Sequence, residues 1–226
     1  MRALTICLCL ILFMSCKNQD SEKPVQPELS IAQKIAHAHG YEHWDKVEQI
    51  DFTFRVDRDQ PGGFRSWQWQ PKTNDITVMT ASDTLSFNRA DLDSISARYD
   101  RAFINDKFWL MIPFQLVWDE GITVSSPVKI ISPVQKKQLN KITLLYSDDG
   151  GYTPGDAYDL FYNDEYLIEE WIFRRGNQPE PGLACTFESY EDFNGIKLAT
   201  EHKKDGENWN LKLLGIKVKM NDQVVD

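Results

Sequence analysis

Apolar and polar residues alternate along much of the chain. Ile50, Phe52, Phe54 and Val56 alternate with charged or hydroxyl residues, a period of two that is typical of a strand with one buried face. Asn194-Gly195 and Asp205-Gly206 are strong signals for two-residue hairpin turns. The pattern predicts further strands at 64–70, 75–81, 84–88, 128–131, 139–147, 156–163, 166–174, 183–191, 196–204 and 208–219.

Helical spacing occurs in only two places. Ser30 and Gln33 have the capping-box spacing, and Gly40 is a natural stop, so a short helix is expected between them. Residues 90–118 have helical spacing and few turn residues, and Pro113 should end or kink that helix. The predicted fold class is mainly β with helices (α+β): a large curved antiparallel sheet, or unclosed β-barrel, covered on one side by helices.

Several predicted strands are apolar on both faces. In 166–174, Trp171 and Phe173 point to one face while Ile172 points to the other. Such strands need cover on both sides, and the helix at 101–118 can cover only one. Sheet curvature, loops or a bound molecule must cover the other face.

The aromatic residues on these elements are the candidate binding residues. Packing in the core is the plain interpretation of each of them, because aromatic side chains dominate protein cores. The functional interpretation is a cupped apolar groove under the helix, sized for a hydrocarbon chain. The residues expected to line it are Trp67, Trp69, Phe108, Trp109, Met111, Phe114 and Trp171.

The first residues have the pattern of a secretory signal. A charged start, an unbroken apolar run and a small residue before Cys16 indicate a lipoprotein signal at 1–15, with Cys16 as the acylated first residue. Ordinary secretion with a free Cys16 is the alternative. Residues 16–28 form the lipidated cysteine and a polar tether with Pro24 and Pro27, and residues 29–226 form a single β-rich domain.

Composition narrows the possible partners. The 226 residues are 42% hydrophobic and carry a net charge of −9. An acidic chain lacks the basic footprint that nucleic acids require, and its net charge also argues against electrostatic docking on anionic lipid. Attachment to the membrane would therefore depend on acyl chains on Cys16. Cys185 is expected to be a small buried hydrophobe.

The sequence gives only weak signals for a metal site. His39-Gly40-Tyr41-Glu42-His43 matches the H-x-x-E-H zinc pattern, but Gly40 should end the helix and separate the two histidines. The aspartates in the loop 148–159 could bind calcium, although their spacing differs from the EF-hand pattern and hydrogen bonding to loop amides is favoured. We therefore assign no metal, cofactor or catalytic residue.

Three segments carry a family resemblance. Residues 38–40 (AHG), 151–160 (GYTPGDAYDL) and 170–176 (EWIFRRG) resemble a family of uncharacterised bacterial lipoproteins. The order of signal, first helix, hairpins and apolar helix is similar to that of the LolA/LolB-like lipoprotein carriers. That resemblance implies an unclosed β-barrel with a helical lid over a cavity for acyl chains. No carrier motif maps onto residues of this chain, so no functional residue is transferred.

Three functions remain open. The first is a membrane-anchored, periplasm-facing lipoprotein of the bacterial cell envelope that binds a lipid or acyl chain without catalysis. The second is an envelope scaffold with a filled core that binds another protein. The third is a metal-dependent hydrolase. The sequence does not distinguish inner from outer membrane.

Overall fold

A computed structural model describes residues 28–149 and 152–221, and within them antiparallel strands are the most common regular structure. The helices are α1 (Ile31–Ala38), the 3-10 helix η1 (Tyr41–Lys46), α2 (Ser96–Trp118) and the 3-10 helix η2 (Arg175–Asn177). The strands are β1 (Val47–Asp57), β2 (Phe64–Gln70), β3 (Asp75–Met79), β4 (Thr84–Asn88), β5 (Ile122–Val124), β6 (Val128–Ile131), β7 (Gln138–Tyr146), β8 (Ala157–Tyr162), β9 (Ile168–Arg174), β10 (Leu183–Thr186), β11 (Glu188–Phe193), β12 (Ile196–Lys203) and β13 (Asn210–Met220).

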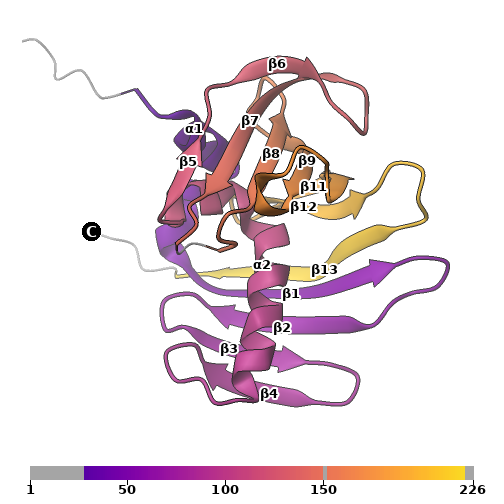
Figure 1. Ribbon diagram of the computed structural model, residues 1–226. Coiled ribbons are helices and arrows are strands. Elements are labelled where there is room, and N and C mark those ends of the chain that lie inside the picture. Colours follow the sequence, from indigo (N-terminus) through magenta and orange to yellow (C-terminus); the bar gives the residue numbers. More distant parts are fainter. Residues whose placement is uncertain (1–27, 150–151, 222–226) are drawn as a thin grey trace, which may run out of the picture.

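The strands form two sheets that do not close into a barrel (Figure 1). The seven-stranded sheet has the order β11-β12-β13-β1-β2-β3-β4. The six-stranded sheet has the order β10-β9-β8-β7-β5, and β6 also pairs with β7. The predicted fold class is confirmed: the chain is mainly β, with large open antiparallel sheets and a few helices.

The two sheets meet where one expected strand is divided. Residues 183–191 were expected to be continuous, but the chain leaves β10 at Thr186 and enters β11 at Glu188. Phe187 donates its backbone N–H to the Glu169 carbonyl oxygen at 2.7 Å and buries its ring. Ser189 then takes a φ of 54°, so the strand bends from one sheet into the other.

Helix α2 crosses the seven-stranded sheet (Figure 1). It begins later than the pattern at 90–118 predicts, because the Asp93 carboxylate accepts from the backbone N–H groups of Ile95 and Ser96 and starts the helix there. Met111 has non-helical backbone angles two residues before Pro113, so the proline kinks the helix as expected but does not end it.

The apolar face of β1 and β2 packs against this helix. Phe52 lies opposite Trp67 and Ile50 opposite Trp69 across the β1–β2 pair. The Phe103 ring of α2 meets both tryptophans edge-on, with centroids 5.4 and 5.6 Å away. All five side chains are buried, so this part of the inner face is filled by the protein itself.

Helix α1 begins and stops as predicted. Ser30 and Gln33 form the capping box. Gly40 has a φ of 91°, and a Cβ at this position would lie 1.9 Å from the Gly195 carbonyl oxygen. Only glycine fits here, because both the backbone angle and the close approach exclude a side chain.

Candidate functional site

One pocket of the described structure is walled mainly by aromatic rings. It has a volume of about 360 Å³ and lies where α2 faces β8, β9 and the start of β10. We call it the aromatic pocket. Its lining residues are Asn105, Phe108, Trp109, Tyr152, Thr153, Asp156, Tyr158, Trp171, Phe173, Arg175 and Leu183.

Stacked and tilted rings build its walls. Phe108 stacks on Tyr152 with centroids 4.0 Å apart and planes 4° from parallel. Trp109 packs on Trp171 at 4.3 Å. Strands β8 and β9 pair Leu160 with Trp171, and Tyr158 lies two residues before Leu160, on the same face of β8. The Tyr158 and Trp171 rings therefore share a face, with their centroids 5.3 Å apart. Side chains of β8 and β9 that alternate onto one face of the sheet thus meet the rings of one turn of α2.

The rim of the aromatic pocket is polar. Asp156 accepts a hydrogen bond from the Gly176 backbone N–H at 2.7 Å, and the Thr153 and Tyr158 hydroxyls lie 3.2 Å apart. Burial raises the pKa of Tyr152 and of Tyr158 above the ordinary tyrosine range, so both phenols stay neutral. Arg175 is exposed. The pocket therefore offers apolar walls with a charged entrance.

The structure brings together three of the seven sequence-predicted binding residues: Phe108, Trp109 and Trp171 line the aromatic pocket. The other four are buried in the main core cluster and line none of the pockets described here. Their exposed fractions are 1% for Trp67, 6% for Trp69, 0% for Met111 and 1% for Phe114. Their role as ligand contacts stays a prediction.

Asp106 holds the pocket-bearing turn of α2 on the sheet. Its buried carboxylate accepts two hydrogen bonds from Arg65, both at 2.7 Å, and one from the Trp67 indole N–H at 2.9 Å. Asn105, on the pocket rim, donates to the same carboxylate at 3.0 Å. Sequence reasoning missed this contact. The available signal was an acidic residue inside the most apolar stretch of the helix, 103–112.

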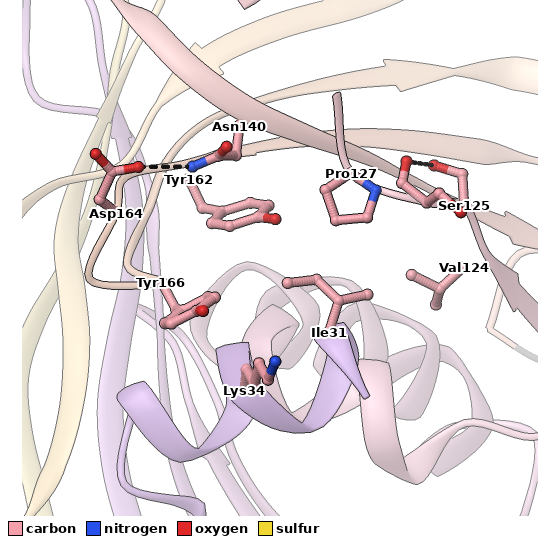
Figure 2. A pocket seen from close by; sticks show the side chains of 10 residues that line it. Ile31, Lys34, Val124, Ser125, Pro127, Asn140, Tyr162, Asp164 and Tyr166 are labelled. Carbon is pink, nitrogen blue, oxygen red and sulfur yellow. Dashed lines mark hydrogen bonds between the residues drawn. The ribbon is translucent and has the colours of Figure 1, made fainter. Parts of the chain in front are cut away.

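A second, wider pocket lies between α1 and the six-stranded sheet (Figure 2). Its volume is about 560 Å³, and we call it the helix–sheet pocket. Tyr162 and Tyr166 stack there with centroids 5.9 Å apart. Lys34 is held by Glu28 at 2.6 Å. The full lining is Ile31, Lys34, Val124, Ser125, Ser126, Pro127, Asn140, Tyr162, Asp164 and Tyr166.

The histidines of the H-x-x-E-H pattern have structural roles. His39 is buried, with Nδ1 2.8 Å from the Ile35 carbonyl oxygen and Nε2 3.2 Å from the Tyr190 hydroxyl. Gly40 ends the helix, and His43 packs against Gly195. Within residues 28–149 and 152–221, no three histidine, cysteine or acidic residues are grouped so that they could hold a metal ion.

The aspartate loop also has a structural arrangement. Asp156 bonds the Gly176 amide, as favoured from the sequence, while Asp159 pairs with Arg174 at 3.1 Å. Cys185 is buried, as predicted. Its thiol forms no disulfide within the described residues, and burial raises the pKa of that thiol to about 12.

The N-terminal predictions fall mostly outside the described residues. The signal at 1–15, Cys16 and all of the tether at 16–28 except Glu28 lie there. Among the residues that the structure describes, no helix is both long and apolar enough to cross a bilayer. Acylation of Cys16 therefore stays a prediction.

The fold and the aromatic pocket define a class: a mainly β chain whose open antiparallel sheets and kinked helix line a small pocket with aromatic walls and a polar rim. No family model matches the chain, and no curated protein matches it. Among solved structures it is similar to a DUF1329 family protein from Desulfovibrio piger, at 9% identity and a TM-score of 0.43 over 84% of this chain and 90% of that chain. It is also similar to MucB, at 10% identity and a TM-score of 0.25 over 83% of this chain and 57% of that chain. These scores are too low for either likeness to support an argument about function.

Proposed function

We propose that this chain is a membrane-anchored, periplasm-facing lipoprotein of the cell envelope that binds a lipid or acyl chain in the aromatic pocket and catalyses no reaction. The observation that carries the proposal is the pocket itself. Six aromatic rings and Leu183 converge on one opening, and three of the rings were selected from the sequence as binding residues.

The size and lining of the aromatic pocket suit a small apolar ligand. Its volume of about 360 Å³ lies near the lower end of the roughly 300–1,000 Å³ that small-molecule pockets occupy. Each sheltered CH₂ group contributes about 0.8 kcal/mol, so six to eight methylenes give about 5–6 kcal/mol before the costs of association. We therefore expect part of a hydrocarbon chain, rather than a whole lipid, to enter the pocket.

The polar rim of the aromatic pocket indicates which end of a ligand would enter it. A hydrocarbon tail lying in the aromatic pocket against Phe108 and Trp171 would leave its polar end beside Asp156 and Arg175. Such a ligand keeps its headgroup in water, which avoids the cost of burying an unpaired charge.

A pocket-filling variant tests ligand binding. Leu183→Trp adds a ring at the half-buried wall of the aromatic pocket and should weaken uptake of a fluorescent fatty acid at least tenfold. Ser126→Trp adds the same ring at the exposed rim of the helix–sheet pocket and is the matched control. Equal affinity in both variants, or no uptake by the unsubstituted chain, would contradict the proposal.

Anchoring has its own test. Metabolic labelling with a radioactive fatty acid should label the chain through Cys16, and Cys16→Ser should abolish the label. A labelled Cys16→Ser chain, or an unlabelled parent chain, would remove the anchoring part of the proposal and leave ligand binding unaffected.

The filled inner face favours a second candidate, an envelope scaffold. Trp67, Trp69 and Phe103 occupy the space that the predicted groove would need. A scaffold should bring down one protein partner from detergent extracts and carry no lipid in native mass spectra. Lipid that co-purifies with the chain and is lost in Leu183→Trp would reject this candidate.

A further inference from the structure

Three of the four residues of strand β6 are exposed aliphatic side chains. Val128, Ile130 and Ile131 are 50%, 45% and 58% exposed. Five other large hydrophobic residues of the described chain are comparably exposed, but these three lie within four consecutive residues. In the described residues β6 pairs only with β7, so its other backbone edge is open. Val128 and Ile130 lie on one face of this strand, and Lys129 and Ile131 lie on the other. An unpaired strand edge with exposed aliphatic side chains marks an interaction surface.

The charge around β6 differs from that of the rest of the chain. Residues 121–147 contain four lysines and no carboxylate, although the whole chain carries −9. Lys129 pairs with Asp164 at 3.3 Å, and Lys137 pairs with Glu169 at 2.8 Å. Lys136 donates to the Pro133 carbonyl oxygen and has no carboxylate partner among the described residues. The edge is therefore close to neutral and does not repel an anionic surface as the whole chain would.

The chain enters the fold beside this edge. Ile31, in the first turn of α1, faces Val124 and Pro127 across the helix–sheet pocket (Figure 2). Val124 is the last residue of β5 and Pro127 lies in the connection to β6. Figure 1 shows α1 and β6 at the same end of the molecule. The twelve residues from 17 to 28 would span about 37 Å as an extended polyproline-type segment, at ~3.1 Å per residue. An anchor on Cys16 would therefore hold this end of the molecule near its membrane.

We propose that the β6 edge, Val128–Ile131, docks on the surface of the phospholipid bilayer to which the chain is anchored. This inference rests on the proposed anchoring. The aliphatic side chains enter the boundary between headgroups and acyl chains, where amphipathic elements insert about 5–10 Å. The open backbone edge stays at headgroup level, where water satisfies its N–H and carbonyl groups. Docking fixes the direction in which the aromatic pocket faces.

Vesicle flotation tests docking without the acyl anchor. The mature chain from residue 16, carrying Cys16→Ser, is mixed with vesicles of phosphatidylcholine and phosphatidylglycerol. Val128→Asp with Ile131→Asp should lower the bound fraction at least tenfold, because each substitution removes an inserted aliphatic group and adds a charge. Ile95→Asp is the control for adding a carboxylate at an exposed aliphatic position, since Ile95 is 61% exposed but lies in the connection between β4 and α2. It should leave binding within twofold of the parent.

Two further readouts complete the test. Adding salt should change binding less than threefold, because the edge is nearly neutral. Absence of vesicle binding by the parent chain, or equal loss in Ile95→Asp, would overturn the proposal. A photocrosslinker at residue 131 that captures only protein in the envelope would also overturn it, in favour of a strand-pairing partner. Fatty-acid labelling of Cys16 is scored separately, so failed docking and failed anchoring give different results.

Discussion

Replacing Asp106 with leucine is expected to loosen α2 from the sheet. The substitution removes a fully buried carboxylate that accepts from Arg65, Trp67 and Asn105. Loss of one partner of a buried ion pair costs about 3–5 kcal/mol. The Arg65 side chain is 36% exposed and can recover some hydration, which reduces the expected loss to about 2–4 kcal/mol.

Urea and thermal unfolding measure this loss. One kcal/mol shifts the melting temperature of a chain of this size by about 2–4 °C, so Asp106→Leu should lower it by about 4–16 °C. Asp164→Asn is the control, because the Asp164 side chain is 83% exposed and its substitution should change stability by less than about 0.5 kcal/mol.

A double-mutant cycle separates the pair from general disruption. Arg65→Met should cost about 3–5 kcal/mol, because it leaves the Asp106 carboxylate buried without its cation. Arg65→Met with Asp106→Leu should cost less than the sum of the single changes by about 1–3 kcal/mol. Additive single effects, or an Asp106→Leu chain as stable as the parent, would refute the assignment of Asp106 as the contact that holds α2.

Three other predictions follow from buried groups. Burial lowers the pKa values of His39 and His202 to about 4, so both are neutral when folded; stability should be complete above pH 6.5 and fall between there and pH 4. From pH 7 to 5 the free energy of unfolding should fall by about 2 kcal/mol for each histidine. The same decline in a chain carrying His39→Gln with His202→Gln would contradict this prediction. Gly40→Ala should cost more than about 2 kcal/mol in urea unfolding, because it combines a φ of 91° with a backbone clash, and a smaller cost would show that the turn can move. In the mature Cys16→Ser chain, Cys185 should react with a maleimide only in denaturant; rapid labelling of the folded chain would show that the thiol is accessible.

The sequence predicts the strands well where turn residues bound a regular pattern. The bounds of β2, β4 and β6 match the expected 64–70, 84–88 and 128–131. The break between β10 and β11 could not be predicted, because it depends on Phe187 packing into the core and on the backbone angle of Ser189. Strand β5 is only three residues long, too short to establish a periodic pattern.

Only part of the candidate site could be predicted, because side-chain packing in the folded chain decides which rings line it. Residue type selected Phe108, Trp109 and Trp171, but it does not reveal which rings line a pocket and which are packed on all sides. Trp67 and Trp69 are equally aromatic, and the ring of Phe103 fills the space beside them. Tyr152 was missed as a wall residue because it lies in a loop, outside any periodic pattern.

Photocrosslinking with a diazirine-bearing fatty acid tests whether hydrocarbon binds in the aromatic pocket, because peptide mapping reports where the hydrocarbon lies. Labels are expected on the α2 peptide that contains Phe108 and Trp109 and on the β9 peptide that contains Trp171, and both labels should be lost in Leu183→Trp. Labelling confined to the helix–sheet pocket, or none above that of a denatured control, would contradict this expectation.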